Sequence, residues 1–494
     1  MTLLNLSLEE DKAAIERVKQ AEITKKLKEY QPTWEEVFHT GYQIHTGRHK
    51  KGLFEMKNSE ADTQKLKELM TAIQSNEIGS GVSDRKKFSK SHALNQYRLL
   101  LEQRKADIIK EYIANIPDNY HSIQTEEALH DMIQLAKQES ENALDTETTG
   151  LHLEKDKVVG MSITLPKANQ HYYIPFLHQN YNVGNQLEKS KVMKILQSEL
   201  YDRKDLLTVM FNAKFDMHQL IKEGLQFKGT VVDALVGMKI LNENELRYAL
   251  KVLANKWGKY FGYTDNSMTF EELFSKNPED FYIHADYRLC YFYACKDTHL
   301  TYLLYKFIEE QMKKQPKLGH VFFDIEVPIT EISFKMEQNG MPMDLEYADS
   351  YKKQIEEEIA ELDRKIKEFF GDINWNSPVQ IQKKLYEDMK LKPVDDKKGT
   401  GADVLKILSK QVPELEWLLE YRGKTKLLGS FIEPIPQLVW SDGRVHGRFN
   451  SDGTKTGRFS SDLPNLQNIP YPARPMFKAE DGKLIIGIDF SWLM

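Results

Sequence analysis

The chain has 494 residues, 40% hydrophobic and 29% charged, with a formal net charge of −6 that neither supports nor excludes a nucleic-acid partner. Because a single hydrophobic core stops growing at roughly 250–300 residues, this length predicts more than one domain. The two cysteines, Cys290 and Cys295, do not suggest a disulfide framework and no apolar run approaches the ~18 residues of a membrane span, so we expect a globular cytoplasmic protein without a membrane partner.

Residues 1–122 are predicted to form a charged helical N-terminal region. Apolar residues recur at spacings of three and four in stretches such as "AAIERVKQAEITKKLKEY", a pattern typical of amphipathic helices. A Gly/Ser-rich segment, "NEIGSGVSDRKKFSKS", interrupts them. Two interpretations remain open for the basic faces, a solvated surface and a DNA-binding role.

Residues 123–318 are predicted to form an α/β domain, because short β-rich runs alternate with helical patterns. Pro316 and Gly319 mark its end. The β-rich runs are 141–150, 158–165, 171–177 and 206–213, and the helical patterns are 189–201, 216–224 and 288–314.

Residues 319–494 begin with helices, the longest over 345–370. Another helix is expected after Asn376 or Ser377 as its N-cap, with Pro378 in the first turn. From residue 440 onward Gly, Ser, Asn and Pro dominate, which predicts an irregular surface.

Two acids stand close together in the first β-rich run of the α/β domain, "LDTETTGL". Strand alternation places Asp145 and Glu147 on the same face. Carboxylates this close repel each other unless a cation lies between them, and oxygen ligands suit Mg²⁺ or Mn²⁺. Surface strands often carry such a pair by itself, so the pair alone is a weak signal.

Two later segments add candidate partners. "FNAKFDMHQLI" carries Asn212 and Asp216, and "YFYACKDTHL" carries Tyr293 and Asp297 one helical turn apart. Each acid also has an ordinary structural interpretation, Asp216 as a helix N-cap and Asp297 as a solvated helix residue.

Together and in this order, these motifs resemble those of the DEDD superfamily of 3′→5′ exonucleases in its tyrosine-containing form. The resemblance implies a ribonuclease H-like fold over 123–318, with two divalent metal ions (Mg²⁺ or Mn²⁺) held by the four acids. It assigns Tyr293 to the attacking water and Leu151 to a wedge between the last bases. Leu151 could equally pack in the core, and Asp233 is expected to cap the following helix.

The segment "TKTGRFSSDLPNLQNIP" (454–470) combines small residues with polar side chains that suit nucleic acid. Arg458 offers a bidentate fork to phosphate, and Asn465 and Gln467 can donate to and accept from base edges. The alternative is an ordinary Ser/Asn-rich connection.

The whole segment closely resembles the primer- and template-contacting motif of family A DNA polymerases. Segments 336–344, 421–432 and 474–477 fit that family in order. The resemblance implies a mostly helical thumb and the beginning of a palm over 319–494. It also implies DNA primer–template and single-stranded DNA 3′ ends as partners.

The last residues, "KLIIGIDFSWLM", resemble the start of the first palm motif. Leu484–Ile488 is predicted to be a strand, and Asp489 matches an acid that binds polymerase metals. The family pattern stops after Ser491, before the fingers and the second palm acid. We therefore expect no polymerisation by this chain alone, and a split gene, an intron or a truncation would each explain the ending. Interrupted genes of this kind suggest a phage protein in the cytoplasm of a bacterial host.

The predicted function is a truncated or split family A DNA polymerase that acts in replication and carries a two-metal proofreading exonuclease. Two alternatives stay open. One is a non-autonomous subunit whose exposed palm strand pairs with a separate C-terminal polymerase chain. The other is an RNA-processing exonuclease that uses the same four acids.

Overall fold

The computed structural model describes residues 109–180, 182–263, 285–394, 398–454 and 456–488. The predicted helices within 1–108 and the palm acid Asp489 lie outside these ranges. The chain divides into two compact units after Glu331.

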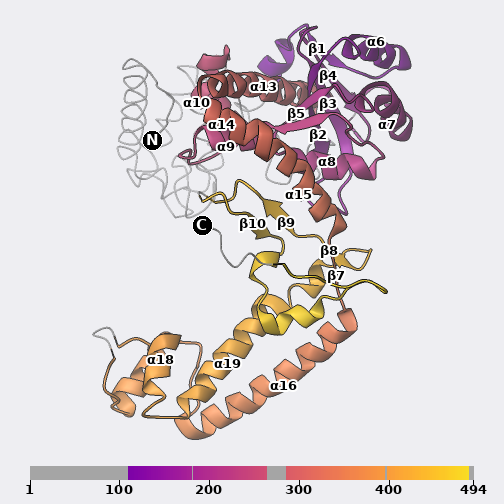
Figure 1. The fold of residues 1–494 in the computed structure, drawn as a ribbon. Coiled ribbons are helices and arrows are strands. Elements are labelled where there is room, and N and C mark those ends of the chain that lie inside the picture. Colours follow the sequence, from indigo (N-terminus) through magenta and orange to yellow (C-terminus); the bar gives the residue numbers. More distant parts are fainter. Residues whose placement is uncertain (1–108, 181, 264–284, 395–397, 455, 489–494) are drawn as a thin grey trace, which may run out of the picture. The chain divides into compact units, whose positions relative to one another are not determined.

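The first unit is built on a six-stranded mixed sheet (Figure 1). Its strand order is β1-β4-β3-β2-β5-β6; β3 is antiparallel to both β2 and β4, whereas the other neighbours run parallel. The mixed α/β fold predicted from the sequence is confirmed. The strands are β1 (Tyr120–Ser122), β2 (Glu141–Thr148), β3 (Val158–Leu165), β4 (Gln170–Pro175), β5 (Leu207–Met210) and β6 (Thr230–Asp233).

Helices cover this sheet, and the longest, α13 (Tyr287–Lys314), packs along β2, β3 and β4. All eight residues of β3 are buried, which explains the nearly continuous apolar run in its sequence. The sequence pattern did not predict β1, α6, β6 or α10, whereas the helix that was expected after Asp233 is α9. The other helices are α6 (Glu126–Ala136), α7 (Lys189–Leu196), α8 (Ala213–Lys222), α9 (Ala234–Leu241) and α10 (Leu250–Trp257).

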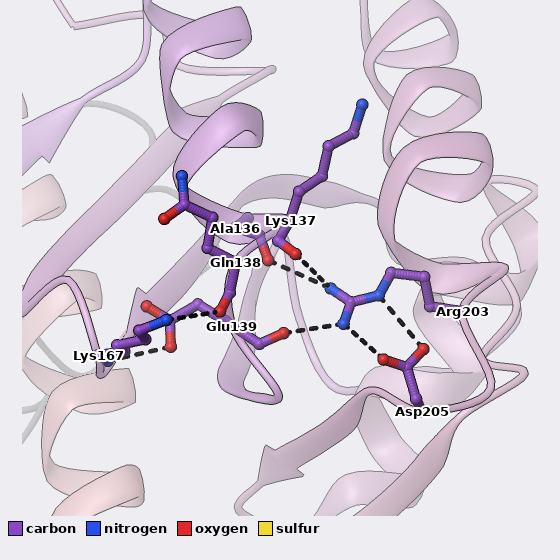
Figure 2. A network of polar contacts seen from close by, with 7 residues as sticks. All are labelled: Ala136, Lys137, Gln138, Glu139, Lys167, Arg203 and Asp205. Atoms are coloured by element: carbon purple, nitrogen blue, oxygen red, sulfur yellow. Dashed lines mark hydrogen bonds and ion pairs between the residues drawn. The ribbon is translucent and has the colours of Figure 1, made fainter.

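The turn that leads from α6 into β2 is held by Arg203 (Figure 2). Its Nη2 donates to the carbonyl of Glu139 at 2.9 Å, and its Nη1 lies 3.4 Å from the carbonyls of Ala136 and Lys137. Asp205 holds the guanidinium from the other side at 2.8 Å. The side chain thus satisfies carbonyls that the end of α6 leaves without helical partners.

The same turn is tied to the β3–β4 connection by the buried carboxylate of Glu139. It accepts hydrogen bonds from the backbone N–H groups of Lys167 at 3.0 Å and Ala168 at 2.9 Å (Figure 2 shows the first). Backbone donors that pair with a buried carboxylate satisfy both partners. The start of β2 is therefore fixed, and its other end carries the acids of the candidate site.

The second unit is largely helical and has two apolar clusters. Ser377 is the N-cap of α17, and its side chain accepts from the backbone of Gln380, so the predicted start of this helix is confirmed. Two short antiparallel pairs, β7 with β8 and β9 with β10, complete the unit. The helices are α16 (Leu345–Phe370), α17 (Pro378–Lys383), α18 (Ala402–Leu408) and α19 (Leu415–Leu427), and the strands are β7 (Met341–Pro342), β8 (Arg444–Val445), β9 (Arg448–Asn450) and β10 (Ser460–Asp462).

Near the predicted boundary at 318 the chain stays helical. After α13 it continues through α14 (Pro316–Gly319) and a π-helical segment, His320–Glu326, into α15 (Val327–Asn339). The division after Glu331 falls within α15.

The predicted strand at 484–488 is wrong for this structure. Residues 483–488 have no regular secondary structure, and the Leu484 side chain is 86% and the Ile488 side chain 85% exposed. A strand requires a ladder partner, and no described strand pairs with this segment.

No described helix has the length and apolar character needed to cross a membrane.

Gly160 in β3 provides a test of the packing behind the sheet. A Cβ atom at this position would lie 2.0 Å from Oη of the buried Tyr173, which donates to or accepts from His178 at 2.8 Å. Gly160→Ala should therefore cost the first unit about 1–3 kcal/mol, measured by hydrogen exchange of the β3 amides. Gly423→Ala, whose Cβ would meet nothing within 4 Å, is the matched control and should leave β3 exchange unchanged. Unchanged exchange in Gly160→Ala would contradict this packing.

Candidate active site

Asp145 and Glu147 lie near the carboxyl end of β2, where the sequence analysis places them. They pair with Ser162 and Gly160 of β3 and alternate with Thr146, so both point to one face of the sheet. Both residues are half-buried. The pairing shifts between Glu147 and Thr148, which ends the regular ladder beside the acids.

Asp216 joins these acids from the first turn of α8. It is 2% exposed, and its Oδ1 accepts from the backbone N–H of Thr146 at 2.9 Å and from its hydroxyl at 2.5 Å. Thr146 stands between the two β2 acids, so these bonds fasten α8 to the strand at the site.

The N-cap interpretation of Asp216 is wrong, because Asn212 precedes α8 as its N-cap. Asp233 caps α9 as expected, and its side chain accepts from Leu235. It also accepts from the backbone N–H groups of Asn212 at 2.9 Å and Ala213 at 2.8 Å, so one carboxylate orders the starts of two helices.

Tyr293 and Asp297 come to the site from α13. Tyr293 is buried at 9% exposure, and the Asp297 side chain is 13% exposed and forms an ion pair with Lys251. Asp297 is therefore not the solvated helix acid of the alternative interpretation.

Lys251 of α10 is the residue of the site that sequence reasoning missed. It is 5% exposed, and its Nζ lies 4.4 Å from the centroid of the Tyr293 ring. Burial is the main reason that the pKa of Lys251 falls to about 7, and the nearby Lys296 lowers it further. Asp145 and Glu147 act on that pKa in the opposite direction. The stretch "YALKVLANKW" contains two lysines, and no motif in it could have indicated that Lys251 belongs to the site.

The electrostatics of the acids reflect their crowding. Burial raises the pKa of Asp145 to about 6, against the lowering effect of Lys251. Burial, and then the charge of Asp145, raise the pKa of Glu147 well above its ordinary value. The same two causes raise the pKa of Asp216, against the hydrogen bonds from Thr146. Burial is the largest cause for all three acids, and the charge of Asp145 makes Glu147 and Asp216 still harder to ionise.

The donor chemistry of this site fits a divalent cation. The four carboxylates offer only oxygen ligands, and the charge that they share favours a cation. Within the described ranges, however, no three Asp, Glu, His or Cys side chains are placed as a ready metal cage. The ammonium of Lys251 stands among them instead.

The residues predicted to contact DNA lie on exposed surfaces. Leu151, in the loop after β2, is 84% exposed, so the core-packing alternative is wrong. In the second unit Arg458 is exposed in the loop between β9 and β10. Asn465 and Gln467 are exposed too, and the Asn465 side chain accepts from the Gln467 N–H at 3.1 Å, which caps a short 3₁₀ turn.

Comparison with known proteins identifies both parts of the chain. Residues 120–313 match the family model of 3′-5′ exonucleases, and residues 345–493 match that of DNA polymerase family A.

Curated relatives are bacterial DNA polymerases I. The chain is 29% identical to that of Borreliella burgdorferi over 75% of this chain and 40% of the relative. It is 29% identical to that of Pseudomonas aeruginosa over 71% and 39%, and 34% identical to the thermostable enzyme of Thermus aquaticus over 37% and 23%. The chain thus spans about two fifths of the length of the first two relatives.

A solved structure supports the fold. The POL domain of Pol1 from M. smegmatis, in complex with DNA primer-template and dNTP, aligns with a TM-score of 0.58 and 20% identity, over 73% of this chain and 59% of that chain. The chain therefore belongs to the family A DNA polymerases, with a 3′-5′ exonuclease domain and the start of a polymerase domain.

Proposed function

We propose that the first unit is a divalent-metal-dependent 3′→5′ exonuclease that removes nucleotides from single-stranded or frayed DNA 3′ ends. The observation that carries the proposal is a set of neighbouring carboxylates: the β2 acids and Asp297 of α13 interact with the buried Lys251, and Asp216 of α8 lies beside the β2 acids. Carboxylates that lie close together and have raised pKa values are typical of sites that bind cations for phosphoryl chemistry. In a family A polymerase this activity would serve proofreading during replication.

The metal ligands in this proposal are Asp145, Glu147, Asp216 and Asp297. A pair of divalent cations, Mg²⁺ or Mn²⁺, would supply charge stabilisation for the attacking and leaving oxygens of the phosphodiester. Thr146 holds one Asp216 oxygen by two hydrogen bonds, which limits the rotation of that carboxylate. The second oxygen remains for a cation.

Tyr293 would orient the attacking water through its phenol. The Lys251 ammonium lies over its ring at 4.4 Å, and the side chain is buried, so few orientations are open to the hydroxyl. A fixed donor near the reacting phosphate contributes through orientation.

Leu151 is proposed to separate the last bases of the substrate. Its side chain is 84% exposed although it is apolar, and stacking against a base would remove that area from water.

The polymerase-type motif with Arg458, Asn465 and Gln467 favours DNA over RNA as the substrate, because an RNA-processing exonuclease would not need a primer–template surface.

The first experiment follows 5′-labelled DNA and RNA strands of the same sequence with Mg²⁺. DNA should shorten from its 3′ end, and Asp216→Asn should lower the rate by at least about 10²-fold, since a metal ligand is weakened. Asparagine is preferred to alanine because it keeps the acceptor for Thr146, whose loss would cost about 1–3 kcal/mol.

The matched control is Asp131→Asn, which changes an exposed acid on α6 and should retain wild-type activity. Near-wild-type cleavage by Asp216→Asn would show that the cluster is misassigned. Cleavage of RNA at a rate equal to or above that of DNA would favour the RNA-processing alternative.

Arg458 tests the DNA-binding role of the second unit. Because we propose that its guanidinium meets the DNA backbone or minor groove, Arg458→Ala should weaken primer–template binding several-fold for all sequences. Fluorescence anisotropy with labelled duplexes measures the effect, and Lys410→Ala, an exposed cation of the same unit, is the control. A loss confined to particular sequences would contradict this role.

A second candidate function is that of a subunit or segment completed by further palm strands. The exposed apolar side chains of Leu484, Ile485, Ile486 and Ile488 favour it, because a palm sheet would cover them. Primer extension with Mg²⁺ and deoxynucleotides should therefore show only shortening by this chain, and extension by the chain alone would contradict this candidate.

A further inference from the structure

Lys251 occupies an unfavourable place for a cation. It is the second residue of α10, which begins at Leu250 after Ala249, an N-cap without a side-chain hydrogen bond. The positive end of a helix dipole repels an ammonium, and burial at 5% exposure removes most of its hydration. A specific attraction from nearby acids offsets part of these two unfavourable contributions.

The attraction comes from the acids of the proposed exonuclease. The ammonium forms an ion pair with Asp297, and the charges of Asp145 and Glu147 act on it. The Tyr293 ring faces it at 4.4 Å. One lysine thus contacts or faces residues from both β2 and α13 that would hold or serve the metal ions.

We propose that Lys251 is a resident counter-cation, which holds the carboxylates together in the metal-free enzyme and is displaced from Asp297 when a divalent cation binds. This inference rests on the proposed metal-dependent function. Lys251 is a positioning residue in this account, since it acts through the acids. Its ammonium and the divalent cation compete for the same oxygens, so the lysine lowers metal affinity while it stabilises the metal-free fold.

The first test is a Mn²⁺ titration followed by electron paramagnetic resonance of the free ion. Lys251→Met, of similar length but uncharged, should bind Mn²⁺ roughly tenfold more tightly than the wild type, because the competing charge is gone. Lys251→Gln, a polar variant, should shift affinity the same way and covers the case in which the methionine variant does not fold.

Lys259→Met is the matched control. It removes an exposed ammonium that also lies over a tyrosine ring, Tyr260, at 4.7 Å, and it should leave Mn²⁺ affinity unchanged. Asp216→Asn separates this inference from the proposed function. If the wild type and Asp216→Asn bind Mn²⁺ equally, the metal site itself is misassigned.

Two further readouts do not depend on activity. Without metal, Lys251→Met should unfold at a lower temperature than the wild type, and saturating Mn²⁺ should remove that difference. Acetylation of Lys251, followed by mass spectrometry, should be slow without metal and several-fold faster with Mn²⁺. Unchanged or weaker Mn²⁺ binding by both Lys251 variants, or acetylation that Mn²⁺ does not change, would overturn the displacement.

Discussion

Mutual repulsion among buried carboxylates is the constraint on which the first unit depends. Burial raises the pKa of Asp145, Glu147 and Asp216, and the charge of Asp145 raises the pKa of the other two acids further. Lys251 offsets part of this repulsion by an ion pair with Asp297. Such a cluster is stable only where the surrounding fold holds the acids in place. The clustered negative charge favours a bound cation, and this is the defining property of the site.

The fold holds the acids in place by fixing β2 at both ends. Arg203 and Glu139 anchor the turn that enters the strand, and Thr146 fastens α8 to its far end. Rigid elements, not loops, therefore carry all the proposed metal ligands. This suits a site in which small displacements weaken both metal binding and the alignment of the attacking water.

The second unit is organised differently. Its proposed DNA contacts, Arg458, Asn465 and Gln467, are exposed side chains on loops and a short turn. Contacts to phosphate and base edges require solvent-facing groups, whereas the proposed metal ligands Asp145, Glu147 and Asp216 are half-buried or buried. The charged groups proposed to function are thus enclosed within the first unit, whereas those proposed to contact DNA are exposed on the second unit.

The strands β2, β3, β4 and β5, the long helices and the candidate acids could be predicted from the sequence alone, because period, length and local motif are properties of neighbouring residues. The sequence pattern missed α10 and Lys251, and it predicted a strand over 484–488 that has no ladder partner in the described structure. The cation that lies among the acids and the apolar side chains that stay exposed became evident only in the folded chain. Ion pairs between distant segments and strand pairing depend on partners far away in the chain, which local sequence does not encode.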